Sequence, residues 1–120
     1  MSGRLESIMK KLEIIIRPER LEDLKKILDN NQANGLMITN IMGYGNQKGF
    51  KHIYRGTEYS VNLLPKVKVE TVVPTDVSER IIEDVLKEIN TGKYGDGKIF
   101  IYDVEDAVRI RTGERGKEAL

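Results

Sequence analysis

The sequence predicts a single α+β domain, and three observations predict that class. Four segments are strand-like, and in two of them, residues 12–16 and 67–73, apolar residues recur at the two-residue period of half-buried strands. Two segments between them carry apolar residues at helical spacing. The order strand, helix, strand occurs twice, once on each side of a long glycine-rich connection. This duplicated order predicts the ferredoxin-like βαββαβ arrangement, a four-stranded antiparallel sheet with both helices on one face.

The first half begins with a strand-like run from Met9. Its alternating apolar residues share one face: Leu12, Ile14 and Ile16. Pro18 ends this strand and suits the first turn of a helix. The apolar face of that helix is formed by Leu21, Leu24, Ile27 and Leu28. Asparagines and a glycine over residues 30–35 end the helix, and residues 36–42 predict the second strand.

The second half begins with a strand whose alternating residues are Val67, Val69 and Val73. Pro74 ends this strand, and Asp76 is expected to cap the next helix, with Glu79 at the capping-box spacing. The apolar stripe of that helix consists of Val77, Ile81, Ile82, Val85, Leu86 and Ile89. Residues 99–104 predict the last strand of the sheet, and the alternation over residues 108–111 allows a short extra strand.

The composition limits the classes of protein. The chain has 120 residues, 20 Lys and Arg, 19 Asp and Glu, no cysteine, and a net charge of +1. This length suits one domain, and the lack of cysteine excludes disulfides and thiolate metal sites. The near-neutral charge argues against a nucleic-acid coat and a polybasic membrane arm. We therefore expect a cytoplasmic domain over residues 9–112. An N-terminal extension over 1–8, without the apolar core of a secretory signal, would precede it, and a mobile tail over 113–120 would follow.

The connection between the second and third strands, residues 45–62, is predicted to be a functional loop. It shows no sustained period, and connections of this length without structure are uncommon inside a compact domain. Weak β segments near 53–54 and 59–61 leave a hairpin as the alternative. Over residues 45–66 four cations stand against one acid, so the region is basic.

A second glycine-rich loop, residues 91–98, reads TGKYGDGK. It matches most of a P-loop, but Ile99 stands where the motif needs Ser or Thr, and a strand follows where a helix should. We therefore reject a P-loop. The glycine backbone and Lys98 can still bind an anion, and an ordinary helix-to-strand turn is the equal alternative. The segment GYGNQKG, residues 43–49, lacks the dinucleotide-binding pattern, so a mobile surface loop is favoured there.

The last twelve residues form a second basic segment. Arg109 and Arg111 would share one face of an extended segment, and paired guanidinium groups suit phosphate. Solvated surface charge is the alternative interpretation of this pair.

No group of residues forms a complete catalytic set. His52 is the only histidine, and it lacks the partners of a metal site or a catalytic triad. Carboxylates at 83–84 and 103–106 are most simply solvated. A small phosphate-handling hydrolase stays an alternative. An RNA-binding module is another, because aromatic residues alternate with cations in the long connection, although the near-neutral charge counts against it.

Five segments together resemble the PII family of nitrogen-regulatory signal-transduction proteins: GYGNQKG, YRGTEY, LLPKVKVETVVP, TGKYGDGKIFIYDV and RIRTGE. The resemblance covers residues 9–120. It implies a ferredoxin-like homotrimer with a T-loop at 45–62, a B-loop at 91–98 and a C-loop at 109–112. It also implies that ATP or ADP binds between subunits and that 2-oxoglutarate binds beside Mg-ATP. The T-loop would then engage Amt-type ammonium transporters, which would recruit the protein reversibly to the membrane, or nitrogen-metabolism enzymes or transcription factors. No direct contact with nucleic acid and no enzymatic activity is expected.

The resemblance also implies the site residues. The nucleotide would contact Ile15, Gly45, Val72, Gly95, Asp96, Gly97, Lys98 and, from the neighbouring subunit, Arg109 and Arg111. The 2-oxoglutarate would contact Gln47, Lys48, Gly49 and Lys66, and Gln47 would also bind Mg²⁺. A glutamine offers Mg²⁺ a neutral oxygen, so phosphate and oxoacid oxygens would complete the metal site. Because Mg-ATP would then be part of the oxoacid site, the two ligands should bind with positive coupling.

Four positions carry separate expectations. Asn46 stands where many family members have an arginine that reaches the terminal phosphates, so discrimination between ATP and ADP is expected to differ. Met37 replaces a hydroxyl residue often found near the adenine. Tyr59 matches a tyrosine that some bacterial members have uridylylated, and a simple contact residue is the alternative. Thr57 stands where other members carry a phosphorylated serine.

Overall fold

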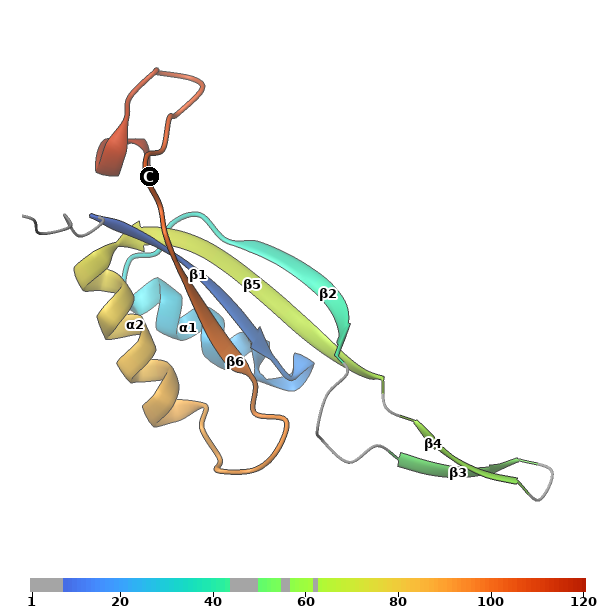
Figure 1. Cartoon of the computed structure of the whole chain (residues 1–120). Helices are drawn as coiled ribbons and strands as arrows, with labels where there is room; N and C mark the ends of the chain where they lie inside the picture. Colours follow the sequence, from blue (N-terminus) through green and yellow to red (C-terminus); the bar gives the residue numbers. More distant parts are fainter. Residues whose placement is uncertain (1–7, 44–49, 55–56, 62) are drawn as a thin grey trace, which may run out of the picture.

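Figure 1 shows the computed structural model, which describes residues 8–43, 50–54, 57–61 and 63–120. Its elements in chain order are β1 (Met9–Ile16), the 3₁₀ helix η1 (Pro18–Arg20), α1 (Leu21–Asn30), β2 (Met37–Gly43), β3 (Phe50–Tyr54), β4 (Thr57–Val61), β5 (Leu64–Pro74), α2 (Thr75–Glu88), β6 (Lys98–Asp103) and the 3₁₀ helix η2 (Gly116–Ala119). Within these residues, no helix is long and apolar enough to cross a membrane.

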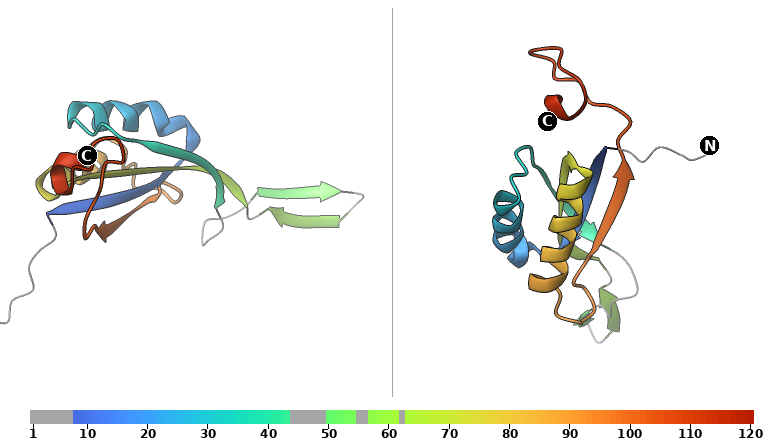
Figure 2. Two further views of the ribbon diagram at one scale, coloured as in Figure 1. Left: turned by 90° about the horizontal axis from the view of Figure 1, so that it is seen from above. Right: turned by 90° about the vertical axis from the view of Figure 1, so that its left-hand side faces the viewer.

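Four strands form one antiparallel sheet in the order β2-β5-β1-β6. Both α-helices lie on the same face of this sheet, as the right-hand view of Figure 2 shows. In the described part of the chain, the opposite face carries no helix, and we call it the open face. This arrangement confirms the predicted ferredoxin-like βαββαβ fold. It also fixes two edges, because β2 and β6 each pair with only one strand.

The core lies between the sheet and the two helices, and it follows the predicted apolar pattern. Its fully or nearly buried members are Leu12, Ile14, Ile16, Leu24, Ile27, Leu28, Val67, Val69, Val73, Ile81, Val85 and Ile89. Burying a side chain of this size contributes about 1.5–3 kcal/mol relative to leaving it exposed. Thr71 is a buried polar residue of β5, and its hydroxyl donates a hydrogen bond to the Gly35 carbonyl at 2.8 Å. The buried hydroxyl is therefore satisfied by a hydrogen bond.

The start of α2 differs from the predicted capping box. The helix begins at Thr75 with Pro74 as its N-cap residue, and no side chain caps it. The reason is that the Thr75 amide donates to the Ile8 carbonyl at 3.0 Å, which starts the helix one residue before the predicted cap. Asp76 thus lies inside the first turn, where a negative charge still favours the positive end of the helix dipole. The expected cap by Asp76 was wrong.

The long connection contains a β-hairpin. β3 and β4 pair in antiparallel register from Phe50 with Val61 to Tyr54 with Thr57, and they form a separate two-stranded sheet. Figure 1 shows this hairpin extending away from the four-stranded sheet. The expectation of a connection without regular structure was wrong for these ten residues, and the hairpin alternative describes them. A two-stranded ribbon of this kind has little stability of its own.

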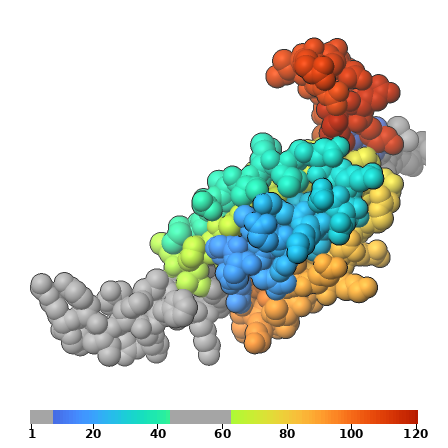
Figure 3. Space-filling view, turned by 180° about the vertical axis from the view of Figure 1, so that it is seen from behind, coloured from blue at the N-terminus to red at the C-terminus, as the bar shows by residue number. Residues whose placement is uncertain are grey.

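The extra strand allowed over residues 108–111 does not form. Val108 makes only an isolated bridge with Arg115, and the chain turns tightly between them. The Gly113 amide donates to the Arg109 carbonyl at 2.7 Å, and the Arg109 amide donates to the Glu114 carbonyl at 2.9 Å. η2 then occupies part of the segment predicted to be a mobile tail. Figure 3 shows this C-terminal segment, in red, projecting from the rest of the molecule.

Candidate anion-binding site

The B-loop, residues 91–98, connects α2 to β6, and Asp96 holds it closed. The Thr91 hydroxyl donates to one carboxylate oxygen of Asp96 at 2.6 Å. The amides of Thr91 and Gly92 donate to the other oxygen at 2.7 and 3.0 Å. The hydrogen bond from the Thr91 hydroxyl, followed by those from the two amides, lowers the pKa of Asp96 below its ordinary value. In this chain, Asp96 therefore shapes the loop through its own donors.

Gly97 brings the B-loop against β1. Its φ is +116°, and a Cβ at this position would lie 1.8 Å from the carbonyl oxygen of Ile15. Only glycine fits such a contact between two backbones. The contact sets the start of β6, where Lys98 pairs with Ile15. Ile15 and the glycines of the B-loop, both predicted for the nucleotide site, therefore do lie together.

Two cations meet on one carbonyl oxygen of the B-loop. The Lys66 ammonium donates to the Gly95 carbonyl at 2.9 Å, and the Arg17 Nε donates to the same oxygen at 3.0 Å. The Arg17 Nη2 also donates to the Tyr94 carbonyl. Burial first, and then the charge of Arg17, lower the pKa of Lys66, and Glu19 and Asp96 act in the opposite direction. A buried ammonium beside a guanidinium is a favourable place for an anion.

Arg17 is the residue that our sequence reasoning missed. Ile16 pairs with Val67, so the next step of the same register sets Arg17 opposite Lys66. Like charges opposite each other on neighbouring strands are unfavourable unless something else offsets them. The sequence alone does not show that Arg17 lies opposite Lys66, because this depends on the register between β1 and β5.

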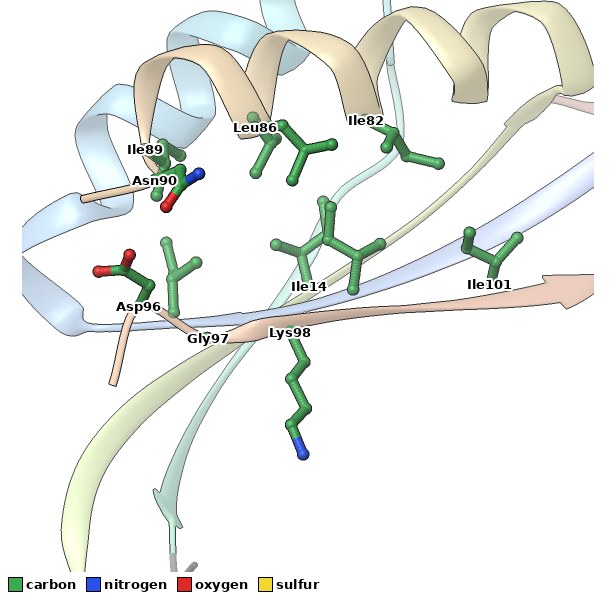
Figure 4. A pocket seen from close by; sticks show the side chains of 12 residues that line it. Ile14, Ile82, Leu86, Ile89, Asn90, Asp96, Gly97, Lys98 and Ile101 are labelled. Carbon is green, nitrogen blue, oxygen red and sulfur yellow. The ribbon is translucent and has the colours of Figure 1, made fainter. Parts of the chain in front are cut away.

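Figure 4 shows an apolar pocket of about 390 Å³ between α2 and the sheet, next to the B-loop. Ile14, Ile82 and Leu86 line its middle, Asp96 lies at one end, and Ile101 lies at the other. The Lys98 side chain points away from this pocket, toward the open face. The pocket therefore lacks the cation of the B-loop, and it is not where we place the anion.

The other predicted nucleotide residues lie far from the B-loop in a single chain. Val72 lies on β5 opposite Lys11, which is four residues, or about 13 Å, from Ile15 along β1. The B-loop precedes β6, whereas Arg109 and Arg111 follow it, so they lie beyond its other end. Figure 1 shows the B-loop and the C-terminal segment at these two ends.

The two arginines do not form the expected pair on an extended segment. Arg111 lies in the turn, and the Arg109 guanidinium donates to the Glu114 carboxylate at 3.1 Å and to the Leu120 carbonyl at 2.8 Å. The prediction of a shared extended face was wrong, because the turn between Val108 and Arg115 replaces the strand.

The remaining predicted residues belong to the long connection between β2 and β5. Gly45, Gln47, Lys48 and Gly49 lie outside the described residues, as do Tyr44 and Asn46. Tyr59 lies in β4, and its backbone pairs with that of His52. Among the described residues, no group of three His, Cys, Asp or Glu could hold a metal ion.

A four-stranded antiparallel sheet with two helices on one face and two cations beside a glycine loop defines a small α+β protein with a candidate anion-binding site. The family model "Nitrogen regulatory protein P-II" matches residues 9–114. The P-II protein of Haemophilus influenzae is 48% identical over 112 residues, which is 93% of this chain and all of the relative. P-II protein 1 of Escherichia coli K12 is 45% identical over the same share of both chains. The chain belongs to the P-II nitrogen regulatory protein family.

Solved structures agree with this assignment. Bacillus subtilis GlnK superimposes with a TM-score of 0.76 at 39% identity, over 93% of this chain and 98% of that one. A GlnK–ATP complex from the same organism has a TM-score of 0.76 at 32% identity, and the match covers 98% of this chain and 100% of that one. Arabidopsis thaliana PII bound to citrate has a TM-score of 0.73 at 32% identity, and the match covers 95% of this chain and 91% of that one. The family expectation from the five sequence segments is thus confirmed.

The contact at Gly97 predicts a large loss of stability for Gly97→Ala. The added Cβ would overlap the Ile15 carbonyl, so β6 has to shift on β1, and we expect the free energy of unfolding to fall by about 3 kcal/mol or more. Gly92→Ala is the matched control. Gly92 also has a positive φ, +77°, but no atom lies within 4 Å of an added Cβ, so a loss of about 1 kcal/mol is expected. Urea unfolding measures both, and equal losses would contradict the role of the backbone contact.

The hydrogen bonds of Asp96 predict a pH-dependent effect of Asp96→Asn. The pKa of this carboxyl is lower in the folded chain than its ordinary value of 3.8. Its stabilisation is therefore fully present above pH 3.8 and is lost as the pH falls through the lower folded pKa. Urea unfolding across this range should show the variant less stable than wild type near neutral pH, with the difference vanishing in acid. Glu83→Gln, on the exposed side of α2, controls for loss of one charge. A difference that does not change with pH would count against the prediction.

Proposed function

We propose that this P-II protein is a homotrimeric, non-enzymatic sensor that binds ATP or ADP and 2-oxoglutarate between its subunits. In this proposal, the T-loop passes the ligand state to an Amt-type ammonium transporter, a nitrogen-metabolism enzyme or a transcription factor. The protein acts in the cytoplasm and reaches the membrane reversibly through a transporter. The observation that carries the proposal is the cationic site at Gly95, where Lys66 and Arg17 meet beside the glycine backbone of the B-loop.

The chemistry of this site suits phosphate and carboxylate groups. Lys66 supplies a buried ammonium, and Lys98 supplies a second one on the open face at the start of β6. Two of the similar structures are a GlnK–ATP complex and a plant PII bound to citrate, which is a carboxylate. These ligands support the assignment of a nucleotide and a carboxylate ligand to this chain.

Magnesium would bind through Gln47 together with oxygens of the two ligands. The described residues offer no cluster of acids or histidines that could hold a divalent ion by themselves. A neutral glutamine oxygen fits a metal whose remaining ligands come from phosphate and from a 2-oxo acid. When bound, Mg²⁺ supplies the positive charge that joins the two anions. Lys66 would then bind the far carboxylate.

The positions of the cations support an assembly of more than one chain, for which we propose the trimer. The B-loop and Arg111 lie at opposite ends of β6, so one chain cannot bring Lys98 and Arg111 to the same phosphate group. A neighbouring copy can, if the open faces pack together. This face carries exposed apolar side chains, Met37 and Phe100 among them, as an association surface should. The charged residues Lys11, Glu13 and Glu70 pair with one another or with Tyr102 on the same face.

Lys66→Met tests the carboxylate part of the proposal. The methionine keeps the apolar stem and removes the ammonium. In isothermal titration calorimetry, wild type should bind 2-oxoglutarate at least about tenfold more tightly with Mg-ATP than without nucleotide. The variant should lose 2-oxoglutarate binding and keep ATP binding within about threefold, because Arg17 still bonds the Gly95 carbonyl. Lys87→Met, on the exposed side of α2, is the control. Equal 2-oxoglutarate affinity with and without nucleotide would contradict the proposed coupling.

Mixed trimers test whether the nucleotide site lies between subunits. Lys98→Ala and Arg111→Ala alter opposite ends of β6, and each variant alone should bind ATP weakly. If a site takes Lys98 from one subunit and Arg111 from its neighbour, random co-assembly restores about a quarter of the sites. Calorimetry on co-refolded chains measures the number of strong sites, and each variant refolded with itself is the control. A mixture that binds no better than its components would show that the two residues serve one chain.

A further inference from the structure

The Gly95 carbonyl is held by two donors that have different geometries. Arg17 uses two atoms of its planar guanidinium, Nε on Gly95 and Nη2 on the neighbouring Tyr94 carbonyl. Among the described residues, the Lys66 ammonium donates to one carbonyl, that of Gly95. A guanidinium fork that spans two successive carbonyls holds a loop in position, whereas an ammonium at the end of a flexible chain makes a single bond that it can exchange.

The B-loop is also shaped to admit the guanidinium. A Cβ on Gly95 would lie 2.8 Å from the Arg17 Nη2, so the lack of a side chain at Gly95 makes room for this contact. On the other side, Pro18 follows Arg17 directly and begins η1, which restricts the backbone next to the arginine. Arg17 thus joins the end of β1 to the middle of the B-loop.

The surroundings of Lys66 are less favourable to its positive charge than those of Arg17. Its side chain is 8% exposed, its stem lies against Gly43, and the positive charge of Arg17 is close by. A carboxylate that reaches Lys66 would replace a neutral acceptor by an opposite charge, and the attraction between two opposite charges is strengthened in a partly buried site. When Lys66 exchanges the Gly95 carbonyl for the carboxylate, Arg17 stays as the donor to that carbonyl.

We propose that Arg17 is a positioning residue for the nucleotide site, which keeps the B-loop in place when Lys66 leaves the Gly95 carbonyl to bind an anionic carboxylate. The part that concerns the carboxylate rests on the function proposed above. In the unliganded chain Arg17 and Lys66 are redundant, because either one holds the Gly95 carbonyl. In the carboxylate-bound state only Arg17 holds it, so a second ligand can bind without loosening the loop that carries the first.

The redundancy can be tested without any ligand. Amide hydrogen exchange over residues 91–98 is measured for wild type, Arg17→Met, Lys66→Met and the double variant. Each single variant should raise exchange modestly, by about threefold or less, and the double variant should raise it far beyond the product of the two single effects. Arg17→Lys should restore part of the protection. Effects that simply multiply would overturn the redundancy.

Arg20→Met is the matched control for loss of an arginine. Arg20 lies three residues from Arg17 and also donates to two carbonyls, those of Glu88 and Ile89, at 2.9 and 3.3 Å. It therefore bonds the end of α2 and not Tyr94 or Gly95. Combined with Lys66→Met, Arg20→Met should give effects on B-loop exchange that multiply. A strong excess in this combination as well would mean that Arg17 has only the general structural role of a surface arginine.

The exchange of partners is tested with ATP and 2-oxoglutarate. By calorimetry, Arg17→Met should lower ATP affinity by about threefold or less without 2-oxoglutarate and by about tenfold or more at saturating 2-oxoglutarate. An equal loss under both conditions would overturn the exchange. If wild type itself fails to bind either ligand, the proposed function fails, and the ligand-free hydrogen exchange still decides the role of Arg17.

Discussion

The contact between the Gly97 backbone and the Ile15 carbonyl is the constraint on which the site depends. A Cβ at Gly97 would lie 1.8 Å from that oxygen, so the B-loop can lie against β1 only because residue 97 has no side chain. This contact begins β6 in the register that pairs Lys98 with Ile15. It also brings Gly95 within reach of Arg17, two residues after Ile15, and of Lys66 on the neighbouring strand. The backbone contact thus positions three cations around one loop.

The same sheet separates the two basic parts of the chain. β6 has the B-loop at one end and leads to the turn of Arg111 at the other, and the antiparallel pairing with β1 keeps the strand extended between them. In the proposed nucleotide site, a phosphate at Lys98 would therefore meet a guanidinium from the C-terminal segment of a second copy of the chain. The near-zero net charge of the sequence hides this arrangement, since it adds two basic segments to an acidic remainder.

The sequence predicts what depends on local periodicity. The alternation at Leu12, Ile14 and Ile16 and the helical stripe at Ile81 and Val85 locate β1 and α2, and the order of elements is enough for the topology. It does not predict contacts that depend on tertiary register or on an unusual turn. The Thr75 amide finds a carbonyl on the neighbouring chain segment, which removes the need for a cap by Asp76. Arg17 becomes visible as a site residue only when Lys66 is known to lie opposite.

Asp96 shows how a carboxylate can belong to a loop for which we propose anion binding. A free carboxylate beside a phosphate would repel it, but both oxygens of Asp96 already accept hydrogen bonds from Thr91 and Gly92 within the loop. These donors hold both oxygens of the ionised carboxylate, and they lower its pKa below the ordinary value. The loop is thereby closed before any ligand arrives. A ligand then meets backbone that is already ordered, and it does not have to supply the entropy of ordering a glycine-rich segment.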